Sequence, residues 1–201
     1  MHRCGALKCA ALRGFPDAPP ESRISDLIAE RQQLDWLTIS KTAPTSPVLR
    51  RWQKLSKSSF GRWLFARAVG RAAPYFRTIA PRFIELGPAL CRVSLRKRRA
   101  VENHLGSVHA LAMGNLCELA AGMVTEVSLP PSMRWIPRGM TIEYLQPARS
   151  DVTATARLDR NEWSGAQNVG VPVTVVDQAG VEVVRAVITM YVSPRPQPKG
   201  A

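Results

Sequence analysis

The chain has 201 residues, a formal net charge of +13 and four cysteines. This length suits one ordinary domain that buries a core without disulfides or metal, and the cysteines lack the C-x-x-C spacing of a zinc site or a disulfide framework. With no apolar run of about 18 to 20 residues and no continuous signal-peptide core, the sequence predicts a soluble cytoplasmic protein.

Positive charge is concentrated in one part of the chain. Residues 50–99 contain 14 Lys and Arg against the single acid Glu85, whereas residues 101–201 contain 8 Lys and Arg and 9 acids. Such an imbalance is typical of proteins with an anionic partner, which could be the phosphates of a nucleotide-bearing ligand, a membrane surface or nucleic acid. The alternative is a solvated surface that only keeps the protein soluble.

The N-terminal part is predicted to form helices around a linker. Residues 1–47 are expected to be a leader, partly disordered, with one short amphipathic helix between Ser22 and Leu37. Residues 48–72 have helical spacing and predict a basic helix broken near Ser58 to Gly61. Its large apolar positions are Leu49, Trp52, Leu55, Phe60, Trp63 and Leu64. Packing of these side chains against the protein's own sheet is favoured over contact with an anionic membrane.

After Pro81 the pattern changes to that of strands and one helix. A hairpin is predicted from 82–86 and 89–96 around Gly87-Pro88, followed by a helix from Val108 to Ser128 that is apolar on every face. Four further strands are predicted as an antiparallel meander, with a turn at Asp177–Gly180; they cover residues 135–145, 152–159, 169–176 and 181–192. Residues 196–201 are expected to be a disordered tail.

A helix that is apolar all round is best buried when a curved sheet wraps around it. The element order resembles the hotdog fold, an α+β architecture in which a curved antiparallel sheet encloses one long helix. This domain is expected to span residues 48–195 and to carry extra N-terminal helices.

Two polar residues stand out in the buried helix segment. His109 and Glu118 lie among Leu, Ala, Met and Gly, where an unpaired charge is costly. Nine residues turn a helix by two and a half turns, so the two side chains should point to opposite sides about 13 Å apart along the axis. If both belong to one site, two chains related by a two-fold axis must build it, which predicts an obligate homodimer.

Residues Asn103, Gly106, His109 and Glu118 resemble the signature of hotdog-fold acyl-CoA thioesterases of the phenylacetyl-CoA thioesterase type. The likeness in element order runs from about Phe60 to Val192, and the chain is similar to an uncharacterised, arginine-rich branch of that superfamily. The resemblance implies thioester hydrolysis without a metal or a redox cofactor, coenzyme A being part of the substrate.

By this resemblance, the backbone N–H of Ala110 would hold the thioester carbonyl, and Glu118 from the second subunit would be general base or nucleophile. Asn103 and His109 would orient the water and the thioester. The expected substrate-binding residues are Gly106, Gly122, Trp135 and Tyr144. Basic side chains from the first half would bind the phosphates of coenzyme A.

Two positions depart from the family. The chain has His109-Ala110-Leu111 where His-Gly-Gly is common, and Gly122 where many relatives carry Ser or Thr. Other roles stay open for the site residues: Glu118 could pair with an arginine at an interface, and His109 could bond the local backbone at the helix start. Cys117 is expected to act as a small hydrophobe.

The partners expected are an acyl-CoA thioester and a second copy of the chain, with association into a tetramer left open. A membrane surface could be contacted through basic residues 50–71, and nucleic acid is not expected as a partner. The rival function is a non-catalytic acyl or acyl-CoA binding module with a basic arm that contacts membrane or nucleic acid.

Overall fold

The computed structural model describes residues 46–159 and 163–196, and the expected leader and tail lie almost wholly outside them. The helices are α2 (Pro47–Leu55), α3 (Ser59–Ala72), the 3-10 helices η1 (Pro74–Ile79) and η2 (Arg99–Val101), and α4 (Ala110–Ser128). The strands are β1 (Arg82–Gly87), β2 (Leu90–Leu95), β3 (Met133–Tyr144), β4 (Val152–Arg157), β5 (Gln167–Asp177) and β6 (Glu182–Pro194).

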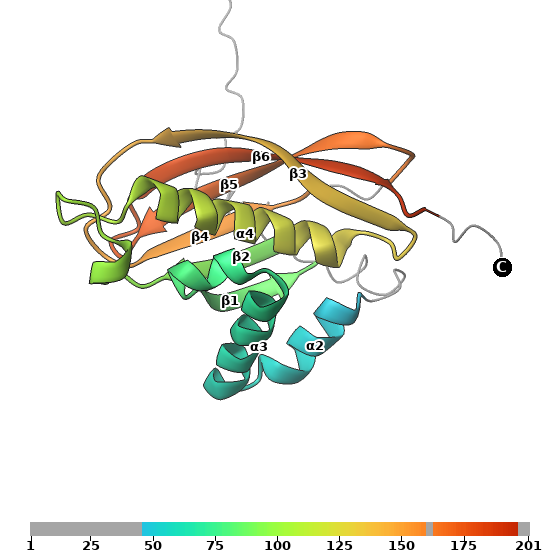
Figure 1. Cartoon of the computed structure of the whole chain (residues 1–201), viewed down its shortest axis with the longest axis horizontal. Coiled ribbons are helices and arrows are strands. Elements are labelled where there is room, and N and C mark those ends of the chain that lie inside the picture. The colour runs from blue at the N-terminus through green and yellow to red at the C-terminus, as the bar shows by residue number, and fades with distance from the viewer. Residues whose placement is uncertain (1–45, 160–162, 197–201) are drawn as a thin grey trace, which may run out of the picture. The chain divides into compact units, whose positions relative to one another are not determined.

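The strands form one antiparallel sheet that curves around α4 (Figure 1). Its order is β1-β2-β4-β5-β6-β3, so β1 and β3 are the two edges. The predicted strands are confirmed to within a few residues, but the predicted meander is correct only for β4, β5 and β6. β3 pairs with β6 at the far edge, because the chain crosses the sheet through α4 before β3 begins.

The core lies between α4 and the concave face of the sheet. On β5 the buried positions alternate, and Val171, Val173 and Val175 are at most 1% exposed. Thirteen of the 19 residues of α4 are buried, which confirms a helix enclosed on most of its surface. Burial of each such aliphatic side chain stabilises the fold by about 1.5–3 kcal/mol.

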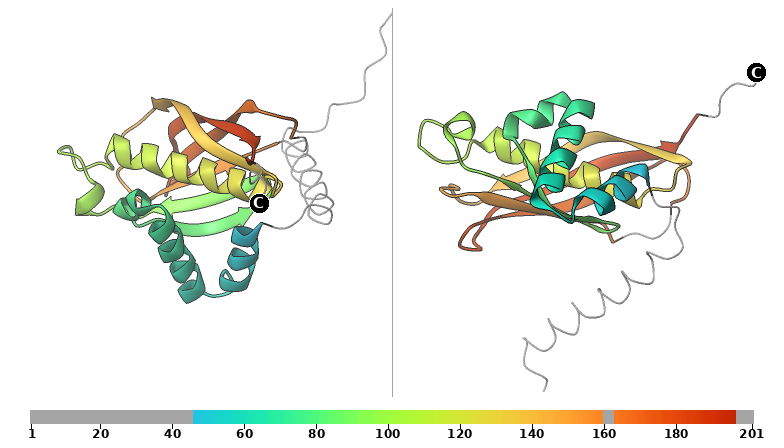
Figure 2. Two further views of the ribbon diagram at one scale, coloured as in Figure 1. Left: turned by 45° about the vertical axis from the view of Figure 1, so that its right-hand side comes forward. Right: turned by 90° about the horizontal axis from the view of Figure 1, so that it is seen from below.

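Helices α2 and α3 form a V-shaped hairpin next to β1 (Figure 2). Its inner face is an aromatic cluster in which the Trp52 and Phe65 rings lie 5.1 Å apart and Phe65 and Phe83 also 5.1 Å apart. The predicted break is confirmed: Ser58 Oγ caps α3 by accepting from the Gly61 N–H at 3.0 Å.

Gly61 at the start of α3 lies directly against the end of α2, where a Cβ would lie 1.9 Å from the carbonyl oxygen of Leu55. Only glycine allows this approach, which fixes the angle of the V.

The expectation that all the aromatic residues of this segment pack against the sheet is wrong for two of them. Phe60 is 70% and Trp63 52% exposed, because they lie on the opposite side of α3 from Phe65. Among the helices described here, none has the length and hydropathy to cross a bilayer.

Candidate functional site

A tight loop leads into the N-terminus of α4 and is organised by Asn103. Its Oδ1 accepts hydrogen bonds from the N–H groups of Leu105 (2.9 Å) and Ser107 (3.1 Å), and its Nδ2 donates to Ser107 Oγ (2.9 Å). Gly106 lies at the tip with φ +71°, a left-handed conformation that favours glycine. Both residues therefore shape the loop that delivers His109, and Gly106 faces open space.

His109 is the N-cap of α4. Its Nδ1 accepts the Leu111 N–H at 3.1 Å, which is the local backbone bond foreseen as an alternative role. Because Nδ1 is the acceptor, the neutral ring carries its proton on Nε2, and that donor points away from the cap. His109 is exposed, so Nε2–H is accessible to a ligand.

The Ala110 N–H begins the first turn of α4. Within the described part of the chain no acceptor bonds to it, since the first N–H groups of an α-helix have no partner inside the helix. A free N–H at a helix N-terminus lies at the positive end of the helix dipole. This donor is suited to hold an oxygen on which negative charge develops.

One row of α4 residues, spaced by four, faces β3. The row consists of Ala110, Gly114, Glu118, Gly122 and Glu126. Rows of this spacing are inclined to the helix axis, and the curved β3 runs along this one in the opposite direction. Contacts at both ends of the row show this directly, from Trp135 at one end and Tyr144 at the other.

Near the C-terminal end of the row the Trp135 ring covers Gly122. A Cβ on residue 122 would lie 2.8 Å from the Cη2 atom of Trp135. The indole is held there because its Nε1–H donates to Glu126 Oε2 at 2.8 Å. Gly122 is buried beneath the ring, so the indole of Trp135 covers it at this point, and a role of Gly122 in substrate binding stays a prediction.

Near the N-terminal end Tyr144 reaches the first turn of α4, where its Oη donates to the carbonyl oxygen of Ala110 at 3.2 Å. Burial raises the pKa of Tyr144, and interaction with Cys117 adds to the shift, so the phenol remains a neutral donor. A Cβ on Gly114 would meet Tyr144, Ile142 and Met140 only at ordinary distances of 3.7–3.9 Å.

Glu118 lies between these two contacts and faces a small cavity of about 210 Å³. The cavity is also lined by Pro137, Gly139, Met140 and Ile188. A register shift between Pro137 and Gly139 interrupts the pairing of β3 with β6 at this point, and Gly139 brings no side chain to the lining. Over residues 46–159 and 163–196, Glu118 has neither a hydrogen bond nor an ion pair, whereas Glu126 is bonded to Trp135.

The cavity residues on β3 and β6 were not among the predicted site residues. A proline and a glycine close together inside a strand pattern indicate a bulge at an edge strand, and that signal was present at Pro137 and Gly139. Ile188 gave no signal, since a buried aliphatic residue on β6 looks the same whether or not it lines a cavity.

Cys117, next to Glu118, points into the core. Burial raises its pKa to about 12, so the thiol stays protonated near neutral pH and is not a nucleophile. The structure thus brings together Gly122 with Trp135 and Ala110 with Tyr144. It does not bring the side chains of His109 and Glu118 together within one chain. His109 caps the N-terminus of α4, and Glu118 lies nine residues further along the same helix.

The edge strand β3 is long and open. It has 12 residues, and its second edge has no neighbour among the strands described. Apolar side chains are exposed along it: Ile136 is 59% and Tyr144 44% accessible. A long edge of this kind is normally covered or paired in a native protein.

A curved antiparallel sheet wrapped around one long helix is the architecture of the hotdog fold. Comparison with solved structures bears this out. The probable thioesterase PA5026 from Pseudomonas aeruginosa, described as a protein of unknown function, is 22% identical with a TM-score of 0.58, over 66% of this chain and 95% of that chain. Thioesterase HI1161 from Haemophilus influenzae is 13% identical with a TM-score of 0.57, over 67% and 94%.

The chain belongs to the family described as Domain of unknown function (DUF4442), which matches residues 61–192. A crystal structure of a protein designated genomics APC5556 is 43% identical, with a TM-score of 0.66, and the match covers 74% of this chain and 98% of that chain. No curated protein matches the chain.

Proposed function

We propose that this protein hydrolyses an acyl-CoA or related thioester at sites shared between two copies of the chain. The observation that carries the proposal is Glu118. It is a half-buried acid without a hydrogen-bond or ion-pair partner in the described residues, and it faces a cavity beneath the open edge strand. The thioesterases of the same fold, PA5026 and HI1161, support the reaction class.

The start of α4 supplies the electrophilic half of the site. The free Ala110 N–H donates to the thioester carbonyl oxygen, and the helix dipole stabilises the negative charge that develops there during attack. The accessible Nε2–H of His109 is a second donor for the thioester. Asn103 and Gly106 act as positioning residues, because they form the turn that holds His109 at the cap.

Glu118 supplies the other half. As a general base its carboxylate takes a proton from a water molecule, whose oxygen attacks the thioester carbon. Collapse of the tetrahedral intermediate then expels the coenzyme A thiolate and leaves the carboxylic acid. Direct attack by the carboxylate, followed by hydrolysis of the anhydride, is the alternative. Trp135 and Tyr144 form the walls on either side of the acid, and Lys and Arg side chains bind the phosphates of coenzyme A.

The shared site follows from the open edge. Pairing of β3 with β3 of a second copy about a two-fold axis would continue the sheet through both subunits and cover the apolar side chains along it. The α4 helices then lie side by side in opposite directions, so His109 of one subunit approaches Glu118 of the other. Each dimer contains two equivalent sites.

Hydrolysis is tested by release of free thiol from a panel of aliphatic and aromatic acyl-CoA substrates. Glu118→Gln should lower kcat by about a hundredfold or more, the usual contribution of a general base. Glu126→Gln is the matched control, because it lies two turns along the same row and its amide oxygen can still accept from Trp135. Binding of acyl-CoA without turnover would instead make the protein a non-catalytic acyl-CoA binding module.

Mixing two inactive variants tests whether the site is shared. His109→Ala and Glu118→Gln chains, unfolded together and refolded in equal amounts, form heterodimers with one intact site and one doubly altered site. Random pairing should restore about a quarter of the wild-type activity. If each site lay within one chain, no activity would return.

A further inference from the structure

The α2–α3 hairpin carries an apolar tip that the proposed catalytic function does not use. Phe60, Trp63 and Leu64 are 70%, 52% and 42% exposed, and with Arg67 they follow the i, i+3, i+4, i+7 spacing of one helix face. The Phe60 and Trp63 rings stack at 5.5 Å, and the Arg67 guanidinium lies 5.0 Å from the centre of the Trp63 ring. The opposite face of α3 is anchored in the core through Phe65.

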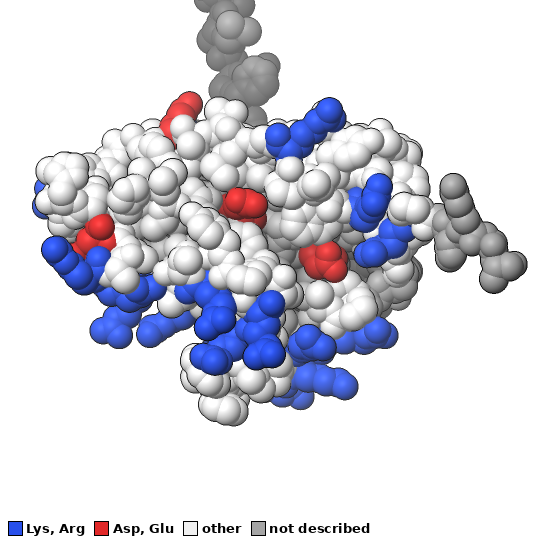
Figure 3. Space-filling view, in the orientation of Figure 1, with Lys and Arg blue, Asp and Glu red and all other residues white. Residues whose placement is uncertain are grey.

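Positive charge surrounds this tip. Residues 46–80 contain eight Lys and Arg and no Asp or Glu. None of the three ion pairs found in the described residues involves a cation of this stretch. In the space-filling view, blue side chains gather along the lower side of the molecule around the uncoloured end of the hairpin (Figure 3).

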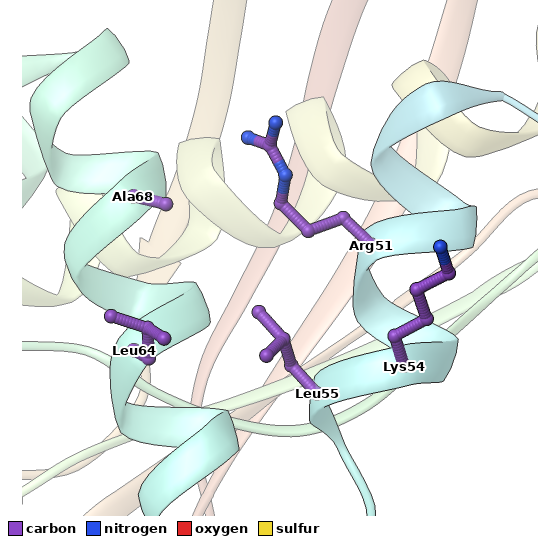
Figure 4. A pocket seen from close by; sticks show the side chains of 5 residues that line it. All are labelled: Arg51, Lys54, Leu55, Leu64 and Ala68. Atoms are coloured by element: carbon purple, nitrogen blue, oxygen red, sulfur yellow. The ribbon is translucent and has the colours of Figure 1, made fainter.

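A notch between the two helices adds a third feature. It has a volume of about 360 Å³ and is lined by Leu55, Leu64 and Ala68, with Arg51 and Lys54 completing the lining (Figure 4). Leu55 from α2 and Leu64 from α3 point toward one another across the space, while the Arg51 side chain extends past them. An apolar floor with cations beside it matches a molecule that has a hydrocarbon chain and an anionic head.

We propose that the α2–α3 hairpin docks the protein on bilayers that contain anionic lipids. Phe60, Trp63 and Leu64 insert at the level of the headgroups, and the surrounding Lys and Arg side chains bind lipid phosphates. The notch accommodates part of a lipid chain beside Arg51 and Lys54. The hairpin lies next to β1, at the opposite edge of the sheet from β3, so docking leaves the proposed dimer edge free.

An anionic bilayer fits these observations better than nucleic acid does. A phosphate backbone would use the cations but would leave the notch, which is lined by leucine and alanine, unoccupied. The exposed Leu64 is aliphatic, so it offers no ring on which a base can stack. Membrane-surface helices, in contrast, combine Trp, Phe and Leu with Lys and Arg.

The test is flotation of the full-length protein with vesicles of phosphatidylcholine alone or with about 30 mol% phosphatidylglycerol. The protein should float with the anionic vesicles and not with the neutral ones. Phe60→Ser/Trp63→Ser should weaken binding by about tenfold or more, and Arg51→Gln/Lys54→Gln by a similar factor with a shallower salt dependence. All four side chains are exposed, so the substitutions should leave the fold intact. Thermal melts of each variant check this, and the midpoints should be unchanged.

Control variants remove exposed apolar side chains or exposed charges at positions outside the hairpin. Val181→Ser/Val187→Ser deletes two exposed apolar side chains, and Arg149→Gln/Arg157→Gln removes two exposed charges. Both should bind like the wild-type protein. If test and control variants weaken vesicle binding equally, the proposal is overturned. Binding would then depend on the overall charge and surface of the chain and not on the α2–α3 hairpin.

Fluorescence locates the contact. Trp63 emission should shift to shorter wavelength when anionic vesicles are added, and the shift should disappear in Trp63→Phe, which keeps an aromatic wedge and should still bind. Absence of vesicle binding overturns the proposal, whether the protein binds a DNA duplex instead or the hairpin variants change only its self-association.

Discussion

Two glycines of α4 provide a sharp test of the packing around Glu118. Gly114 and Gly122 lie one turn before and one turn after the acid and both are buried beneath β3. A Cβ at 114 would meet its nearest neighbours at 3.7–3.9 Å, whereas a Cβ at 122 would lie 2.8 Å from the Trp135 ring. The same substitution should therefore have opposite effects at the two positions.

Gly114→Ala should stabilise the protein by about 0.5–1 kcal/mol, because alanine loses less backbone entropy than glycine in a helix and the added methyl group fits. Gly122→Ala gains the same helix preference but forces the indole away from the helix, and such overpacking costs about 1–3 kcal/mol. Its net effect should be a loss of up to about 2 kcal/mol. Displacement of the ring also strains the Trp135–Glu126 hydrogen bond.

Urea unfolding followed by far-UV circular dichroism measures both free energies. In a Trp135→Leu background the obstacle is gone, so Gly122→Ala should become stabilising, with a coupling of about 1–3 kcal/mol between the two positions. Equal stabilisation by Gly114→Ala and Gly122→Ala in the wild-type background would refute the close contact between Gly122 and Trp135.

Three further outcomes follow from the structure. Gly61→Ala should lower the melting temperature by several degrees, since its Cβ would meet the Leu55 carbonyl oxygen at 1.9 Å and the helices cannot separate without loosening the hairpin. Gly106→Ala should cost about 1 kcal/mol because its φ is +71°, measurable by the same unfolding assay. Cys117 should react with a thiol reagent at pH 8 only after unfolding, because burial raises its pKa to about 12; rapid labelling of Cys117 itself in the folded protein, located by peptide mass mapping, would contradict this.

The long helix and the strands follow from sequence periodicity, but their order in the sheet does not. A period of two indicates a strand at β3, of which only Met133 is buried, and it is silent on which neighbour the strand pairs with. That choice depends on how the chain crosses the sheet through α4, which is a non-local property. The predicted meander therefore failed at β3, the strand that forms the open edge.

The same limit applies to the two acids of α4. Glu118 and Glu126 are eight residues apart in an apolar segment, and sequence spacing places both on the β3 side of the helix. Only the tertiary contact separates them, because the Trp135 indole bonds to Glu126 and leaves Glu118 beside the cavity. The resemblance points to Glu118 by position, and the structure adds that its carboxylate, unlike that of Glu126, has no hydrogen bond within the described residues.

Aromatic residues in α2 and α3 show why composition alone could not assign the hairpin. Trp52 and Phe65 pack on Phe83, while Phe60 and Trp63 lie on the outer face of α3. Both sets occupy helical spacing, so α3 is apolar on two sides, and only one of them fits against β1. The packing interpretation of this basic segment therefore holds for Trp52 and Phe65 and not for Phe60 and Trp63, and membrane contact stays a prediction.

Glycine residues near Glu118 explain how its carboxylate keeps an open cavity beside it between α4 and β3. A strand that packs on a helix normally covers every position of the row it faces. Here bulky β3 side chains settle over Gly114 and Gly122, and the register shift between Pro137 and Gly139 falls between them, opposite the acid. The carboxylate thus faces a small cavity while Gly114 and Gly122 on either side of it are buried, and we expect a regular, unbulged β3 to narrow that cavity.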